Sequence, residues 1–272
     1  MENTQDYIEN EINEVLKLNK LIIKKREEKY NVIFLNINYL FIEINYNNAI
    51  ILLIVGTINN NLDVYNTCYL LLLEVYVNNN FNLLLRVSNT LNKGKQLDSS
   101  IKSFMSCLIC EYKDTSSEVN SLINQINKII PLVDKYKRNI IQNVEPEIDG
   151  SKSVFFPSFI TIFDCIKDNV SKNNFKKINS KLDEIINRKE KIYELDKFRD
   201  NQFGHINKYS KIHDIKFISY YLSPAIQSYI KDLDKLIDEI QIHFFHIKFS
   251  REQIGRPTPE QFFNYFIPSK MK

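Results

Sequence analysis

Glycine and proline are scarce in this sequence, which has five and seven of them in 272 residues. Folds rich in β-sheet use these residues in the turns that join short strands, so such folds are disfavoured. The composition therefore predicts an all-α protein built from long helices. An apolar fraction of 44% can fill a core, which argues against a disordered chain.

A strong net charge is also missing. The 36 basic and 33 acidic residues leave a formal net charge of +3. Proteins that bind nucleic acid over a broad surface usually carry a clear basic excess. We therefore expect any contact with RNA to be confined to one site.

The sequence has neither a secretory signal nor a long apolar run. Residues 1–6 are polar and acidic, whereas a signal begins with basic residues followed by an apolar stretch. The longest apolar runs, 49–55 and 69–73, are too short to span a bilayer. We expect a cytoplasmic protein that does not enter a membrane.

Cysteine is limited to four residues, Cys68, Cys107, Cys110 and Cys165. In a cytoplasmic chain of this length we expect the thiols to stay reduced. Cys107 and Cys110 have the spacing of a metal or redox pair, but no second such pair and no histidine lies near them in sequence. We therefore expect the cysteines to fill the core, and we expect no metal or other cofactor.

Helical periodicity of apolar residues is what the sequence has in abundance. It predicts helices at residues 6–30, 97–112, 117–142, 157–170, 174–203 and 211–249. Residues 62–91 are expected to form two helices that separate at the three asparagines 78–80, because asparagine favours caps and loops. Pro224 predicts a kink or break near Leu222.

Residues 32–57 are ambiguous, because they are rich in Ile, Tyr, Phe and Val, which favour strands. A hairpin with its turn at 45–48 is one interpretation. We prefer a helix, since the surrounding pattern is helical and an isolated hairpin would expose its edges.

Two stretches contain the residues that interrupt regular structure. Residues 144–151 are the clearest loop, with Pro and Gly beside Asp and Ser. The segment from Arg251 contains a glycine and three prolines and predicts an irregular tail. We therefore divide the chain into 1–150, an N-terminal helical part of a bundle, 151–250, the helices that carry the motif described next, and 251–272, the C-terminal tail, within one continuous domain.

Residues 197–205 combine side chains that are suited to phosphate chemistry. Arg199 offers a fixed fork of donors for a phosphate, and His205 offers a proton acceptor that works near neutral pH. Six positions on a straight helix would set the two side chains about 120° apart. Gly204 favours a left-handed cap that ends the helix, so His205 can turn back toward Arg199.

These two side chains suffice for RNA cleavage without a metal. The imidazole would take the proton of a ribose 2′-hydroxyl, whose oxygen attacks the adjacent phosphorus, and the guanidinium would stabilise the charge on the phosphate oxygens. The products are a 2′,3′-cyclic phosphate and a 5′-hydroxyl. Between the two residues lie Asp200 and Asn201, which can orient the histidine or bind the ribose, and we assign the orienting role to Asp200.

The sequence Phe-Arg-Asp-Asn-Gln-Phe-Gly-His resembles the R-(D/N)-x-x-x-(A/G)-H signature of the HEPN superfamily. It is most similar to an abortive-infection branch of that superfamily, in which the motif also follows a helix. Asp200 and Gly204 stand at its polar and small positions. The resemblance is specific over residues 191–208, and the rest of the chain is compatible with it by composition.

The resemblance implies an antiparallel helical bundle that forms a homodimer, in which two Arg…His pairs meet in one composite site. It also implies a toxin or antiphage effector that cleaves tRNA or mRNA and is controlled by an antitoxin or another regulatory protein. In some relatives a partner modifies a tyrosine two residues after the histidine. Asn207 stands there and Tyr209 lies further on, so the resemblance leaves open whether Tyr209 is modified.

Other interpretations of the same residues remain open. Arg199 and His205 can be a solvated helix end, with Arg199 paired to Glu194 or Asp196. The protein can also be a HEPN-like module that binds RNA, a nucleotide or a partner without catalysis, or a purely structural helical protein. The basic residues at 176, 177, 181, 188, 189 and 191 can steer RNA, but interleaved acids make a solvated face an adequate explanation. His243 and His246 are expected to be packed or partly exposed.

Overall fold

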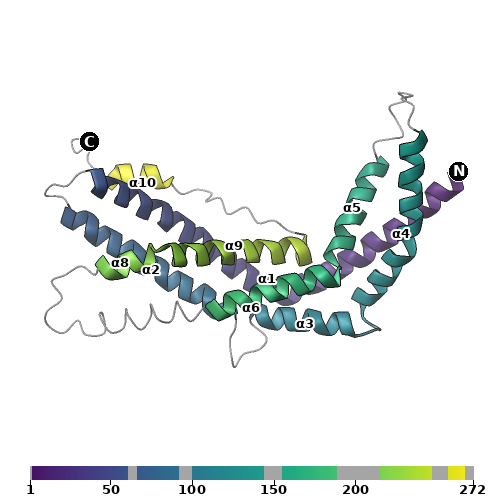
Figure 1. Ribbon diagram of the computed structural model, residues 1–272, viewed down its shortest axis with the longest axis horizontal. Coiled ribbons are helices and arrows are strands. Elements are labelled where there is room, and N and C mark those ends of the chain that lie inside the picture. Colours follow the sequence, from purple (N-terminus) through teal and green to yellow (C-terminus); the bar gives the residue numbers. More distant parts are fainter. Residues whose placement is uncertain are drawn as a thin grey trace. The chain divides into compact units, whose positions relative to one another are not determined.

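The computed structural model describes residues 2–60, 66–91, 100–143, 155–188, 215–246 and 257–266. Every regular element in these ranges is an α-helix (Figure 1), which confirms the all-α prediction. The helices are α1 (Glu2–Asn60), α2 (Asn66–Leu91), α3 (Ile101–Lys113), α4 (Glu118–Asn143), α5 (Phe155–Asn169), α6 (Lys172–Arg188), α8 (Ile215–Tyr221), α9 (Pro224–Phe245) and α10 (Pro259–Phe266).

Helix α1 continues through the ambiguous stretch 32–57, so the preferred helix is confirmed there and the expected end near residue 30 is wrong. Ile37, Phe41 and Ile44 are fully buried. Their spacing of four and three residues places them on one stripe of a helix. Burying this stripe outweighs the preference of single Ile, Tyr and Phe residues for strands.

Helix α2 also continues through the asparagines 78–80, so the expected separation into two helices is wrong. Asn80 is fully buried, and its Nδ2 donates to the Ile44 carbonyl at 3.1 Å and to Asn48 Oδ1 at 2.9 Å. These contacts supply the buried amide with acceptors on α1. The low helix propensity of asparagine is overridden by this contact between helices.

Two helix starts follow local chemistry that the sequence shows. Ser117 precedes α4 and its Oγ accepts a hydrogen bond from Asn120 N at 3.2 Å, as an N-cap does. Pro224 is the first residue of α9, where a missing N–H costs nothing, and α8 ends at Tyr221. The predicted break near Leu222 is confirmed.

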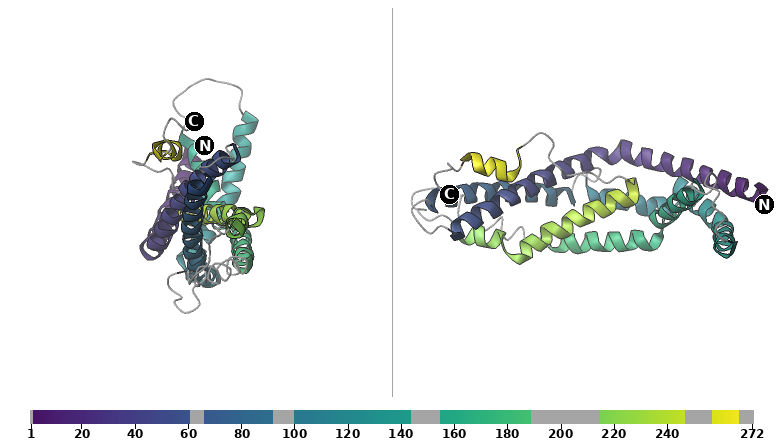
Figure 2. Two further views of the ribbon diagram at one scale, coloured as in Figure 1. Left: turned by 90° about the vertical axis from the view of Figure 1, so that its left-hand side faces the viewer. Right: turned by 90° about the horizontal axis from the view of Figure 1, so that it is seen from above.

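The expectation of an irregular tail is wrong for its middle part, which forms α10. Thr258 and Gln261 cap this helix reciprocally, with Gln261 Oε1 accepting from Thr258 N at 2.9 Å and Thr258 Oγ1 accepting from Gln261 N at 3.2 Å. Phe262 packs edge-on against Tyr46, with ring centroids 6.3 Å apart, and α10 lies along α1 (Figure 2). Tyr265 of the same helix is 85% exposed.

The chain divides into two compact units, each assembled from separate stretches. Unit 1 comprises Met1–Asn31, Ser103–Ser180 and Ile240–Ile247, and unit 2 comprises Val32–Lys102, Lys181–Glu239 and Lys248–Lys272. In unit 1, Phe104 lies among aromatic rings of α1 and α9. In unit 2, Phe81 of α2 meets Phe217 of α8 edge-on at 5.6 Å.

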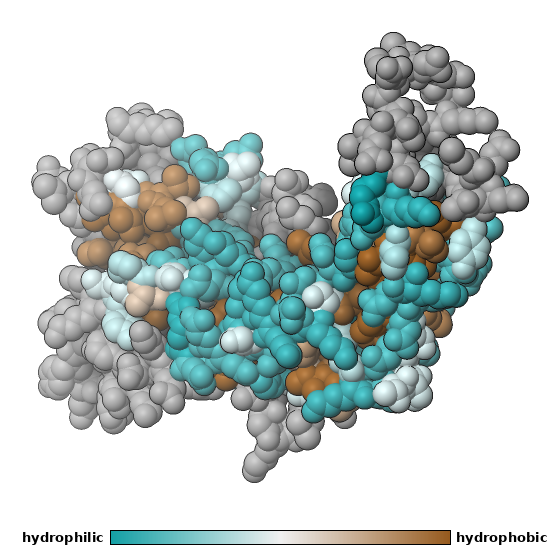
Figure 3. Space-filling view, turned by 45° about the vertical axis from the view of Figure 1, so that its right-hand side comes forward, coloured by the Kyte–Doolittle hydropathy of each residue, from teal (hydrophilic) through white to brown (hydrophobic). Residues whose placement is uncertain are grey.

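Hydrophobic residues gather in several patches between hydrophilic ones on the face drawn in Figure 3. Within Asp6–Ile58 of α1, one 18-residue window has a mean hydropathy of 1.5, which is long and apolar enough to cross a membrane by length and composition alone. One third of that window is buried inside the protein. Core helices pass the same test, so the location of the protein stays a prediction.

Candidate functional site

The predicted catalytic segment lies outside the described residues. Arg199, Asp200, Asn201, Gly204 and His205 all fall in residues 189–214, between the end of α6 and the start of α8. The predicted helix 174–203 is present as α6 up to Arg188, and its remainder falls in the same segment. The assignment of the motif therefore stays a prediction. The structure describes the helices before and after it, α6 and α8.

Two basic side chains of α6 are held by acids of α9 within unit 2. Lys181 Nζ contacts Glu239 Oε1 at 2.5 Å, and Arg188 Nη1 donates to Asp232 Oδ2 at 2.7 Å. The hydrogen bond from Arg188 is the main cause that lowers the pKa of Asp232. These pairs fix α6 to α9 and neutralise two of the cations that were considered as RNA-steering residues.

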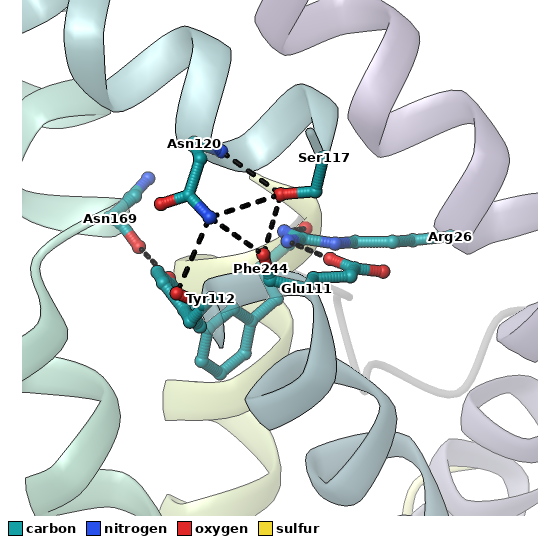
Figure 4. Close-up of polar contacts among 7 residues, drawn as sticks. All are labelled: Arg26, Glu111, Tyr112, Ser117, Asn120, Asn169 and Phe244. Atoms are coloured by element: carbon teal, nitrogen blue, oxygen red, sulfur yellow. Dashed lines mark hydrogen bonds and ion pairs between the residues drawn. The ribbon is translucent and has the colours of Figure 1, made fainter. Parts of the chain in front are cut away.

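A cluster of polar contacts in unit 1 surrounds Arg26, which is only 8% exposed (Figure 4). Its Nη2 donates to Glu111 Oε2 at 2.9 Å, and its Nη1 donates to the Phe244 carbonyl at 3.4 Å. That carbonyl lies in the last turn of α9, where helix carbonyls have no partner within the helix and a positive charge is favourable. Arg26 thus connects α1, α3 and α9.

The polar groups beside Arg26 close the turn between α3 and α4 (Figure 4). Asn120 Nδ2 donates to the carbonyls of Glu111 and Tyr112 at 3.3 and 3.4 Å, and also to that of Asp114. Ser117 Oγ donates to the Glu111 carbonyl at 2.6 Å. These side chains satisfy the last carbonyls of α3, which is a structural task.

Two titratable groups complete the cluster. Burial raises the pKa of Tyr112 to about 12, so this phenol stays protonated at neutral pH, and it donates to the Asn169 carbonyl at 3.5 Å. His246 is exposed and follows α9 with a left-handed φ of 56°, and its Nε2 lies 3.0 Å from Asn169 Nδ2. Neighbouring side chains partly remove water from the His246 ring and so lower its pKa, and the positive charges of His243 and Arg26 lower it further.

The cluster therefore brings Arg26 and His246 near each other, but their hydrogen bonds hold helices together. Arg26 is already paired with Glu111. Its partners lie 85 and 218 positions away in sequence, so no local motif could predict this cluster. His246 was expected to be packed or partly exposed, and it is exposed. Among the described residues, no group of three or more His, Cys, Asp or Glu side chains could hold a metal ion.

The expectation that the cysteines fill the core is wrong for the three that the structure describes. Cys110 and Cys165 are exposed and Cys107 is half-buried, and all three are free thiols. Cys107 and Cys110 lie in the C-terminal half of α3, where Cys110 is directed away from the core that Met105 and Leu108 fill. The thiol of Cys110, and in part that of Cys107, is therefore accessible to reagents in solvent.

Replacing Arg26 by methionine should lower the free energy of unfolding by roughly 1.5–3 kcal/mol, the range for hydrogen bonds to charged groups. Methionine keeps most of the side-chain length but leaves Glu111 and the Phe244 carbonyl without their donor. Urea unfolding measures the loss. The matched Arg138→Met change, at an exposed arginine of α4, should cost less than about 0.5 kcal/mol. Equal losses in the two variants would contradict the role of Arg26.

The lowered pKa of His246 predicts a pH dependence with a definite sign. Below its ordinary value of 6.5, the unfolded chain takes up a proton that the folded ring resists, so acid favours unfolding. Stability is fully retained above that value and is lost as the pH falls through the folded pKa. His246→Asn, which tolerates the left-handed backbone, should reduce the loss of stability between about pH 7.5 and about pH 5.5 in urea titrations. An unchanged pH dependence would exclude this contribution.

No family model, no curated protein and no solved structure matches this chain. The resemblance to the HEPN superfamily therefore depends on the motif of residues 191–208. The described helices agree with it only in their all-α fold class.

Proposed function

We propose that the protein is a metal-independent endoribonuclease of the HEPN kind, in which Arg199 binds and stabilises the phosphate and His205 acts as the general base or acid. The observation that carries the proposal is the sequence from Arg199 to His205. This short stretch contains an arginine that can bind phosphate, an acid that can orient a histidine, a glycine that favours a helix-ending cap, and an imidazole.

The described helices support this proposal by the way they flank the segment. Helix α6 is amphipathic, with Phe175, Ile178, Leu182 and Ile185 on its buried stripe. After the segment, Phe217 of α8 is fully buried. The end of α6 from Lys181 onward and helix α8 both belong to unit 2, so residues 189–214 stand in sequence between two packed helix ends of that unit.

We further propose that the active site is composite. In a two-fold symmetric homodimer the same segment of both protomers meets itself, so two Arg199…His205 pairs would share one cleft. Asp200 would orient the histidine, and Asn201 would contact the ribose. In the cell such an enzyme would act as a toxin or antiphage effector on tRNA or mRNA, under the control of an antitoxin or another regulatory protein.

Incubation of the purified full-length protein with total RNA and with tRNA tests this function. We expect cleavage that persists in EDTA, with 2′,3′-cyclic phosphate and 5′-hydroxyl ends identified by end-specific ligation and sequencing. Cleavage that stops in EDTA, or that leaves 5′-phosphate ends, would contradict the mechanism. If RNA binds without being cut, a non-catalytic HEPN-like binding module becomes the better explanation.

A further inference from the structure

The two thiols of α3 are placed where both can react. Cys107 and Cys110 are three residues apart on one helix, and both are free. Cys110 is exposed, whereas Cys107 is half-buried and lines a cavity of about 180 Å³ together with Lys25, Lys29, Tyr30 and Glu111. A small reagent therefore has access to Cys110 from solvent and to Cys107 through this cavity.

Helix geometry permits a bond between these two sulphurs but does not favour it. Three helical steps separate the Cα atoms by about 5 Å, which lies inside the range found for disulfides. The corresponding Cβ atoms are about 5–6 Å apart, whereas a relaxed disulfide holds them near 3.8 Å. A bond here would distort the last turns of α3, and strained disulfides are easily reduced again.

A basic side chain stands beside one of the sulphurs. Lys29 Nζ lies 3.8 Å from Cys107 Sγ and 5.1 Å from the centre of the Tyr30 ring. An ammonium group in this position attracts the negative charge that a sulphur carries while it attacks a disulfide. Cys107 is thus suited to the second, intramolecular step of an exchange, and the more exposed Cys110 is suited to the first.

We propose that Cys107 and Cys110 form a reversible thiol–disulfide exchange site that reacts with low-molecular-weight disulfides such as glutathione disulfide. The Cys110 thiolate attacks one sulphur of the reagent, the reagent's S–S bond breaks, and one glutathione thiolate leaves. The Cys107 thiolate then attacks Cys110 Sγ, the protein disulfide forms, and the second glutathione leaves. Two electrons and two protons pass from the protein dithiol to the reagent, which becomes two glutathione molecules.

Mass spectrometry of the native full-length protein tests this site. After incubation with glutathione disulfide and an acid quench, the tryptic peptide 103–113 should have lost the mass of two hydrogens, and a reductant should restore it. Cys165 is exposed on α5 with no cysteine near it in sequence, so it should stop at a glutathione adduct. Cys107→Ser should stop at an adduct on Cys110. Lys29→Met should let this adduct accumulate by slowing closure up to about fivefold.

Three results would overturn the proposal. The first is a wild-type protein in which Cys110 keeps its glutathione and never closes to the disulfide. The second is a dithiol that stays reduced while Cys165 reacts. The third is closure that occurs only after the protein is unfolded in denaturant, because the folded helix would then prevent the bond. None of these outcomes depends on whether the protein cleaves RNA.

Discussion

Replacing His205 by alanine should lower the rate of RNA cleavage by about 10²–10⁴-fold, which is the contribution of a positioned general acid or base. Without the imidazole, the ribose 2′-hydroxyl keeps its proton and attacks phosphorus slowly. Single-turnover cleavage of a defined tRNA measures the chemical step directly. The control is His213→Ala, which removes another histidine from residues 189–214 and should keep the wild-type rate.

Arg199 should behave differently from a simple positive charge. Arg199→Ala should lower cleavage by about 10²–10³-fold, as the loss of a donor to the developing oxyanion does. Arg199→Lys keeps the charge but loses the planar fork, so it should recover only part of the rate. Arg138→Ala removes an exposed arginine of α4 and serves as the matched control.

If the site is composite, the two variants should complement each other in a mixed dimer. Mixing Arg199→Ala with His205→Ala chains gives heterodimers in which one protomer supplies an intact histidine and the other an intact arginine. Such mixtures should recover activity that neither variant shows alone. Undiminished cleavage by both single variants would rule out the assigned chemistry, and lost activity without any recovery on mixing would argue that each protomer cleaves alone.

The fold class could be predicted from the sequence because its signal is local. The stripe of Ile37, Phe41 and Ile44 repeats with the period of a helix, and Pro224 marks the start of α9. The helix at the tail also had a local signal, since Thr258 and Gln261 form a capping box. The prolines of the tail outweighed this signal in our prediction.

The features that sequence could not predict depend on partners far away along the chain. Asn80 remains helical because its amide reaches Ile44 and Asn48 of α1, and Arg26 is buried because Glu111 and Phe244 receive its hydrogen bonds. No local pattern encodes such contacts. The exposure of Cys110 is of the same kind, because it depends on which face of α3 packs against the core.

The largest stability effect should come from the aromatic cluster of unit 1. Phe104 is fully buried, with its ring centroid 4.8 Å from that of Tyr30, 5.8 Å from that of Phe244 and 5.3 Å from that of Phe245. Phe104→Ala should lower the free energy of unfolding by about 3–5 kcal/mol, because it removes the ring contacts and leaves a cavity. Urea unfolding followed by circular dichroism measures the loss.

The rings around Phe104 come from α1 and α9, so this side chain fastens α3 to two other helices of unit 1. Ile162→Ala, at a site of α5 that is 45% exposed, removes apolar atoms from the same unit and should cost less than about 0.5 kcal/mol. Similar losses in both variants would show that Phe104 is not at the centre of the core. Hydrogen exchange gives an independent check, since Phe104→Ala should accelerate exchange most in α3 and in the last turns of α9, whose packing depends on this ring.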